Sequence, residues 1–172
     1  MKGILRILLC CALPLLLGLS SCIKEEPESD EVVSIGHRLP NFSVEMNDGR
    51  MVTNQTLLGK VSMIVFFHTG CPDCRQTLPR VQRIYDKYAT EGVEFVLISR
   101  EEVADSVAAY WQRNGLTLPY SAQADRRVYE LFAHKRVPRV YINDRDGIIK
   151  HVFTDDPIPM YESMDDALST LL

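Results

Sequence analysis

The strongest hydrophobic pattern in the chain is an apolar run that leads into a pair of cysteines. Residues 61–67 are nearly all apolar and rich in β-branched and aromatic side chains, as in a strand buried on both faces. Cys71 and Cys74 follow shortly after this run. Beyond them, apolar residues recur at helical spacing at Leu78, Val81, Tyr85 and Tyr88. The pattern predicts a central strand that turns into a helix, with both cysteines at the junction.

Two further patterns predict strands around this unit. Residues 41–57 alternate apolar and polar side chains around the turn sequence Asp48-Gly49, which favours a β-hairpin. Residues 93–98 form a second apolar run. A strand, a helix and a strand with this spacing imply a right-handed parallel crossover. The chain is therefore expected to form an α/β domain that begins with a small β unit.

Helix-capping signals recur in the second half of the chain. Ser99 followed by Glu102 has the capping-box pattern, and so does Ser163 followed by Asp166. Asp125 is expected to cap a further short helix. These signals predict three helix starts after the second strand.

A proline marks the beginning of the next predicted strand. Residues 137–142 form an apolar run that contains Pro138, and residues 148–153 follow as a second strand after a turn. Proline cannot donate a hydrogen bond to a β-ladder, so Pro138 belongs at the first residue of the strand or in a special turn. A cis peptide bond is one device for such a turn.

The N-terminal segment has the organisation of a bacterial export signal. Residues 1–21 begin with Lys2 and Arg6 and continue with an apolar stretch shorter than the ~20 residues that span a bilayer. Residues 19–22, Leu-Ser-Ser-Cys, resemble the lipobox of bacterial lipoproteins. This resemblance implies that Cys22 is lipidated and becomes the first residue of the mature chain. Ordinary cleavage that leaves Cys22 as a free thiol is the alternative.

Three segments follow from this interpretation. Residues 1–21 are the signal peptide, residues 22–36 a lipidated tether, and residues 37–172 the folded domain. The tether is expected to be disordered because it contains little to bury and carries five acids, Glu25, Glu26, Glu28, Asp30 and Glu31. The lipoprotein signal places the protein in the bacterial cell envelope, on the outer membrane and facing either the periplasm or the surface.

Composition and charge narrow the range of partners. The chain is 46% hydrophobic and 24% charged, as in globular proteins, and its formal charge is −4. Removal of residues 1–21, which contain two basic and no acidic residues, makes this charge −6. An acidic surface of this kind argues against nucleic acid as a partner.

The position of the cysteine pair indicates redox chemistry. The first turn of a helix has unpaired N–H groups and partial positive charge, which favour a thiolate at Cys71. Cys74 is one turn away and can attack a mixed disulfide on Cys71. A structural disulfide is disfavoured because so short a loop stabilises little. Zinc is disfavoured because the chain has no second CxxC and no HxxxH spacing.

Several motifs in the same order resemble the TlpA/ResA-type thioredoxin-like proteins. They are the CxxC of Cys71 and Cys74 with Pro79 after it, the strand at 93–98, the Val137-Pro138 pair, and the turn sequence Ile142-Asn143-Asp144-Arg145-Asp146-Gly147. The resemblance extends from about Gly36 to Leu172. It implies a thioredoxin-like α/β fold, with a central mixed β-sheet flanked by helices and an N-terminal β-hairpin.

The resemblance also implies roles for individual residues. Cys71 corresponds to the attacking cysteine, Cys74 to the resolving cysteine, and Pro138 to the cis-proline that faces the pair. The two cysteines form the redox disulfide, and no metal or cofactor is implied. The residues implied to contact the substrate are Val137, Pro72 and Asp73. Val137 would offer its backbone to an extended segment of the substrate.

The chain departs from the family pattern at three positions. Gly70 stands where the family usually has Trp, directly before the first cysteine. Thr77 and Val65 stand where members of the family or classical thioredoxins carry an acid that relays the proton of the second cysteine. His68 could replace that acid, or it could be a packed, hydrogen-bonded histidine.

The expected function is that of a lipid-anchored thiol-disulfide oxidoreductase that acts as a reductase of exported proteins. Its expected partners are protein thiols and disulfides, a membrane electron donor of the thiol-conduit type, and the membrane itself through lipid on Cys22. Two alternatives remain: a thiol peroxidase, and a non-catalytic binding or metal-delivery lipoprotein with the same fold. A basic rim around the active site is also expected, formed by Arg75, His134, Lys135, Arg136 and Arg139.

Overall fold

The computed structural model describes residues 30–172. The predicted signal peptide, the lipidation of Cys22 and the first part of the predicted tether lie outside the described residues. They remain predictions from the sequence.

A five-stranded mixed sheet forms the centre of the domain, in the order β5-β4-β3-β6-β7. Its strands are β3 (Ser62–Phe67), β4 (Glu94–Ser99), β5 (Tyr120–Ser121), β6 (Arg139–Asn143) and β7 (Ile149–Phe153). β3 pairs in parallel with β4 and antiparallel with β6, and every residue of β3 is buried. The predicted central strand and the α/β class are confirmed. The short strand β5, which pairs in parallel with β4, was not predicted.

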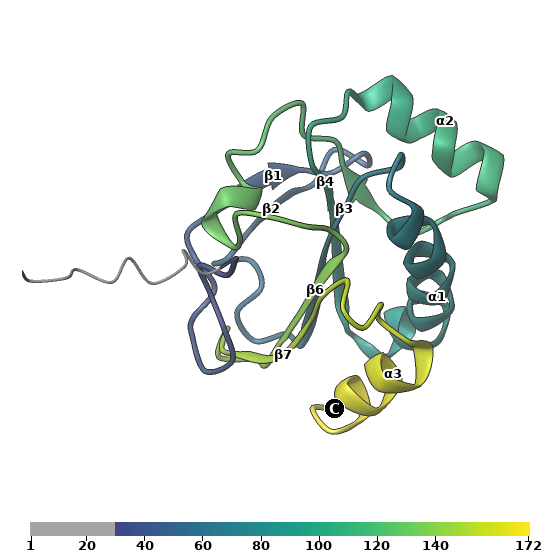
Figure 1. Ribbon diagram of the computed structural model, residues 1–172. Helices are drawn as coiled ribbons and strands as arrows, with labels where there is room; N and C mark the ends of the chain where they lie inside the picture. The colour runs from purple at the N-terminus through teal and green to yellow at the C-terminus, as the bar shows by residue number, and fades with distance from the viewer. Residues whose placement is uncertain (1–29) are drawn as a thin grey trace, which may run out of the picture.

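Helices cover one face and one end of this sheet. They are α1 (Pro72–Tyr88), α2 (Ala104–Asn114) and α3 (Tyr161–Ser169). Of the two short 3-10 helices, η1 (Ala89–Glu91) follows α1, and η2 (Tyr129–Leu131) lies on the opposite face, where Tyr129 packs on Phe66. α1 and α3 lie side by side on one face, and α2 lies beyond the end of the sheet at which β3 leads into α1 (Figure 1). Trp111 of α2 packs on Phe67, with ring centroids 5.0 Å apart, so α2 is fixed beside the end of β3.

The predicted N-terminal hairpin is present as β1 (Ser43–Glu45) and β2 (Met51–Thr53). Gly49 adopts a φ of 84° in its turn, a conformation that glycine adopts without strain. Two hydrogen bonds join the hairpin to β5: the Asn47 N–H donates to the Tyr120 carbonyl at 2.7 Å, and the Ser121 side-chain hydroxyl donates to the Glu45 carbonyl at 2.6 Å. The hairpin is therefore part of the domain.

Two of the predicted helix starts are wrong, and the third is followed by a short 3-10 helix. α2 begins at Ala104, and Ser99 lies instead in β4, where its hydroxyl oxygen accepts a hydrogen bond from the Gln123 N–H at 2.9 Å. α3 begins at Tyr161, ahead of the predicted start at Ser163. The segment after Asp125 forms the 3-10 helix η2 and not an α-helix. In α2 and α3, no side chain caps the N-terminus, so the capping-box pattern was misleading.

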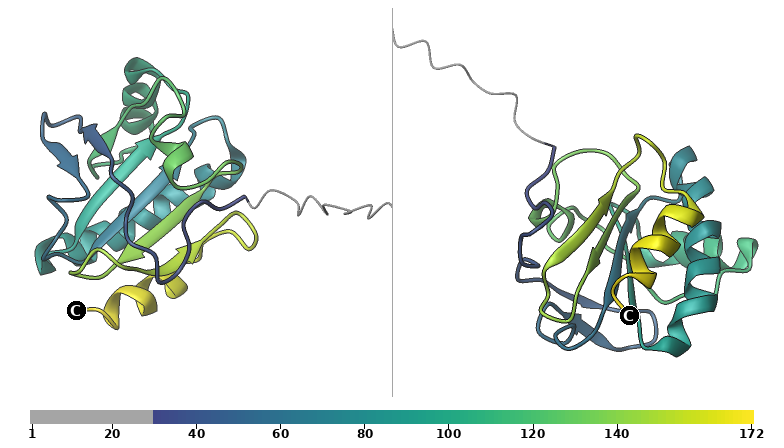
Figure 2. Two further views of the ribbon diagram at one scale, coloured as in Figure 1. Left: turned by 90° about the vertical axis from the view of Figure 1, so that its left-hand side faces the viewer. Right: turned by 90° about the horizontal axis from the view of Figure 1, so that it is seen from below.

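Residues 30–36, expected as part of the tether, contact the domain. Glu31 forms an antiparallel β-bridge with Ala133, and the Val32 and Val33 N–H groups lie 3.0 and 3.2 Å from the Phe132 carbonyl. The Val33 side chain is buried. The segment after residue 30 runs across the face of the sheet opposite α1 (Figure 2). Backbone pairing and apolar burial thus outweigh the unfavourable composition of this stretch.

The acids at the start of this segment pair with the bases of the loop before β6. Arg139 is 2% exposed, and its guanidinium lies 3.3 Å from the Glu31 carboxylate. The Asp30 carboxylate lies 3.3 Å from the Lys135 ammonium and 3.4 Å from the Arg136 guanidinium. The expected basic rim is therefore wrong for these three residues, because each of them pairs with an acid, Arg136 with Asp155 as well as with Asp30, and Arg139 is buried.

We expect Glu31→Gln to lower the free energy of unfolding by about 1–2 kcal/mol. The buried guanidinium of Arg139 would lose its carboxylate partner and stay charged, although the partial exposure of Glu31 moderates the cost. Urea denaturation of the soluble chain from residue 22 measures the change. Glu130→Gln, which removes an exposed i,i+4 pair with Arg126, should cost less than ~0.5 kcal/mol. Equal costs for the two variants would contradict a stabilising role of the pair between Glu31 and Arg139.

Candidate active site

The two cysteines occupy the junction between β3 and α1, as the sequence predicted. Cys71 is the N-cap residue of α1 and has extended backbone angles, φ −80° and ψ 125°. Pro72 follows at the first helical position, where its ring favours helical φ and its missing N–H costs nothing. Cys74 follows three residues after Cys71, within the first turn of α1. Both cysteines therefore lie just beyond the C-terminal end of the buried strand β3.

Burial distinguishes the two cysteines. The Cys71 side chain is half-buried, whereas Cys74 has 0% exposure. Both are free thiols in the structure. A polypeptide that approaches the surface can therefore reach Cys71 and cannot reach Cys74 directly. This asymmetry is what an attacking and a resolving cysteine require.

The environment of Cys74 strongly favours its neutral thiol. Burial raises the pKa of the Cys74 thiol well above its ordinary value, and the adjacent Cys71 sulfur raises it further. A backbone hydrogen bond from His68 and the charge of Arg100 lower this pKa by smaller amounts. At neutral pH Cys74 consequently carries its proton and must lose it before it can attack a disulfide.

The loop before β6 lies against Cys71. The Val137-Pro138 peptide bond is cis, both residues are buried, and the Cys71 thiol donates a hydrogen bond of 3.4 Å to the Val137 carbonyl. The Tyr129 hydroxyl lies within hydrogen-bonding reach of two carbonyls of the same loop, those of Lys135 and Arg136. The structure therefore brings together the cysteine pair and the predicted cis-proline, which lie far apart in the sequence.

The other predicted substrate contacts lie between the cysteines. Pro72 is exposed and Asp73 is half-buried, so both lie at or near the surface beside Cys71. Their predicted role in substrate contact remains a prediction, since no bound partner is present.

Thr77 and Val65 occupy the two positions at which the family resemblance predicts a proton-relaying acid. Thr77 and Val65 are fully buried, and the Thr77 hydroxyl donates to the Asp73 carbonyl of its own helix at 2.9 Å. Neither side chain can accept a proton from Cys74 as a carboxylate would.

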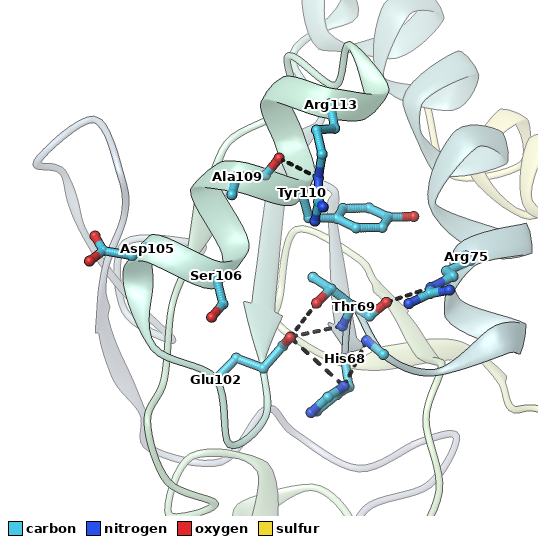
Figure 3. A pocket seen from close by; sticks show the side chains of 10 residues that line it. His68, Thr69, Arg75, Glu102, Asp105, Ser106, Ala109, Tyr110 and Arg113 are labelled. Carbon is cyan, nitrogen blue, oxygen red and sulfur yellow. Dashed lines mark hydrogen bonds and ion pairs between the residues drawn. The ribbon is translucent and has the colours of Figure 1, made fainter.

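A buried acid that sequence analysis missed lies on the other side of the active-site loop. Glu102 is 7% exposed, and its carboxylate accepts a 2.8 Å hydrogen bond from the Thr69 N–H and another from the Thr69 hydroxyl (Figure 3). One Glu102 oxygen is 3.8 Å from His68 Nδ1. The capping-box interpretation had assigned this acid to the start of a helix. No local pattern reveals its contact with Thr69, because that contact joins the ends of two parallel strands.

The conformation of His68 depends on the glycine at position 70. The Gly70 N–H donates to His68 Nδ1 at 2.9 Å, and a Cβ atom at position 70 would lie only 3.0 Å from the imidazole. A side chain at position 70 would therefore displace His68. The histidine is a hydrogen-bonded part of the loop, and the absence of the family's tryptophan accompanies this conformation.

Residues 30–172 contain no group of three or more His, Cys, Asp or Glu side chains arranged to hold a metal ion. Over the same residues, no helix combines the length and the apolar character needed to cross a membrane.

Comparison with known proteins identifies relatives of this chain. The thiol-disulfide oxidoreductase ResA of Bacillus subtilis is 27% identical over 134 residues, which cover 78% of this chain and 73% of the relative. The ResA protein of Bacillus anthracis is 26% identical over 117 residues, 68% of each chain. The solution structure of a provisionally named protein disulfide isomerase from Bacteroides thetaiotaomicron is 25% identical. It has a TM-score of 0.74 and covers 83% of this chain and 91% of that one.

These relatives confirm the thioredoxin-like fold, the resemblance to ResA and the assignment to the thiol-disulfide oxidoreductases. The family model described as AhpC/TSA matches residues 35–152, a stretch that includes the hairpin, both cysteines and the cis-proline. Because this match extends over more than half of the chain, the protein belongs to the AhpC/TSA family.

Proposed function

We propose that the protein is a lipid-anchored, extracytoplasmic thiol-disulfide oxidoreductase that reduces disulfides of exported proteins through Cys71 and Cys74. One observation supports this most directly: a reachable thiol at a helix start touches the carbonyl before a cis-proline, with a buried thiol one turn behind it. This arrangement supports two successive attacks by two different thiols.

In the first step, the Cys71 thiolate attacks one sulfur of the substrate disulfide. A bond forms between Cys71 and that sulfur, and the second substrate sulfur leaves as a thiolate that takes up a proton. Val137 can present its backbone to an extended segment of the substrate beside the new bond.

In the second step, Cys74 loses its proton and attacks the Cys71 sulfur. The bond between Cys71 and the substrate breaks, the remaining substrate sulfur leaves as a thiolate that takes up a proton, and a disulfide joins Cys71 to Cys74. Two electrons have then passed from the enzyme to the substrate. The raised pKa of Cys74 makes the removal of its proton the most demanding part of this step.

The proposed location and electron supply follow from the sequence of the N-terminal segment. A lipid on Cys22 would hold the protein in the bacterial cell envelope. An oxidising compartment would keep the cysteine pair closed, so continued reduction requires a membrane electron donor of the thiol-conduit type. Residues 23–29 can span at most ~25 Å, and Asp30 lies beside the loop before β6. The anchor would therefore attach to the domain on the side of the cis-proline.

Substitution of each cysteine tests the proposed roles. Cys71→Ser should abolish reduction of a disulfide-bonded protein such as insulin. Cys74→Ser should lower turnover by more than ~100-fold and leave a long-lived mixed disulfide, because the resolving thiol is absent. Electrophoresis without reductant detects this adduct. Normal turnover by Cys74→Ser would show that the roles are wrongly assigned.

The environment of Cys74 predicts an unusual pH dependence. In the Cys71→Ser variant, the pH midpoint for alkylation of Cys74 by iodoacetamide should lie well above ~8.5, the value for a free cysteine, because burial raises the pKa. The same variant unfolded in urea should titrate near ~8.5 and serves as the control. A midpoint near this value in the folded protein would contradict the buried, protonated thiol.

Removal of the lipidation site tests the anchor. Cys22→Ser should transfer the protein from the detergent phase to the aqueous phase, because it can no longer receive lipid. Its kcat/KM for insulin should stay within about twofold of the wild type, since the proposed exchange uses only Cys71 and Cys74. Continued partition into detergent would contradict the proposed lipoprotein.

A further inference from the structure

A hollow of about 500 Å³ opens between the active-site loop and α2. Its lining includes Thr69 and Gly70, which directly precede Cys71, and Arg75, which directly follows Cys74. From α2 come Tyr110 and Arg113, and Tyr110 projects between the two arginines (Figure 3). An adjoining hollow is lined by the same three residues and Asn114. The hollow therefore begins at the residues that flank the cysteine pair and extends along α2.

Each of the two arginines is held by a hydrogen bond to a backbone carbonyl, and neither has an acidic partner among the described residues. Arg75 Nε donates to the Thr69 carbonyl at 2.7 Å, and Arg113 Nε donates to the Ala109 carbonyl at 3.2 Å. Within residues 30–172, neither guanidinium forms an ion pair with a carboxylate. Their outer nitrogen atoms remain available as hydrogen-bond donors because only Nε is engaged. By contrast, Lys135, Arg136 and Arg139 on the cis-proline side of the site are paired with three acids, Asp30, Glu31 and Asp155.

The acids of the hollow lie away from the two arginines. Glu102 is buried and engaged with Thr69, and Asp105 lies at the opposite end and points away from the arginines (Figure 3). The Tyr110 hydroxyl donates no hydrogen bond to any residue of the described chain, so it too is available to a ligand. The arginine end of the hollow is thus a positively charged surface with free hydrogen-bond donors and no carboxylate in its lining.

We propose that Arg75, Tyr110 and Arg113 bind an acidic side chain of the substrate polypeptide, close to the disulfide that Cys71 attacks. This inference rests on the proposed function and specifies its substrate class. A carboxylate matches the planar array of guanidinium N–H groups and the phenolic O–H. Positive charge at this position would also steer acidic segments toward an enzyme that is acidic overall.

The absence of a side chain at Gly70 allows the substrate to reach this site. Gly70 is exposed, directly precedes Cys71 and belongs to the lining of the hollow, so no side chain blocks the path at this position. A substrate segment whose cysteine is bonded to Cys71 can therefore extend past Gly70 into the hollow. The acidic residue is expected within a few positions of the substrate cysteine, since Arg75 lies one position after Cys74.

Two disulfide-bonded peptides that differ only in Glu or Lys near the cysteine test the proposal. With the full chain in detergent, Arg113→Gln should lower kcat/KM for the Glu peptide by about 5- to 20-fold, as expected for the loss of a charge-assisted hydrogen bond. The loss should appear mainly in KM, because binding and not bond exchange is affected. The Lys peptide should change by less than about twofold. The difference should shrink between ~0.05 and ~0.5 M salt as screening increases.

Two further variants separate this effect from general charge and folding effects. Arg127→Gln removes the same charge from an exposed residue that does not line the hollow, and it should affect both peptides equally. Arg113→Lys retains the charge without the planar donors and should be intermediate for the Glu peptide. Because Arg113 is exposed, unfolding curves should match the wild type.

The outcomes distinguish this inference from the proposed function. If the wild type reduces both peptides and Arg113→Gln changes them equally, the carboxylate site is wrong and the proposed function stands. If the wild type reduces neither peptide nor insulin, the proposed function fails, and this inference fails with it.

Discussion

The complete burial of β3 is the constraint on which the rest of the site depends. β3 is the central strand, with one neighbour on each side, and its apolar side chains fill both faces of the sheet. Because this strand cannot shift its register without exposing that surface, the position of its end is fixed. The chain must turn there into α1, and the turn places Cys71 at the surface and Cys74 beneath it. The difference in reactivity between the two cysteines thus arises from their positions: Cys71 precedes the first turn of α1 at the surface, and Cys74 lies within that turn, where it is buried.

The two sides of the cysteine pair differ in charge because of contacts that are remote in sequence. On the cis-proline side, Asp30, Glu31 and Asp155 pair with the bases of the loop, and the buried Arg139 holds this loop on the N-terminal segment. On the α2 side, Arg75 and Arg113 have no acidic partner among the described residues, and the acid in the lining that is nearest the loop, Glu102, is occupied by Thr69. Recognition of backbone is thus expected on one side of Cys71 and recognition of charge on the other.

The sequence predicted the features that depend on local periodicity and on strong turn signals. The buried strand, the junction at Cys71, the hairpin around Gly49 and the proline before β6 were all predictable in this way. Glu102 was assigned to a helix cap because a capping box and a long-range contact use the same residues. The pairing of Glu31 with Arg139 could not be predicted, because the acidic composition around Glu31 resembles a disordered segment and its partner lies far away in the sequence.

The central claim is that Cys71 and Cys74 together exchange two electrons with a disulfide substrate. Mass spectrometry after reaction of the reduced protein with one equivalent of a disulfide-bonded peptide tests it most directly. The account predicts one Cys71–Cys74 disulfide for each peptide reduced, and no oxygen added to either sulfur. Reduced peptide accompanied by free Cys74, or by a sulfenic acid on Cys71, would contradict it.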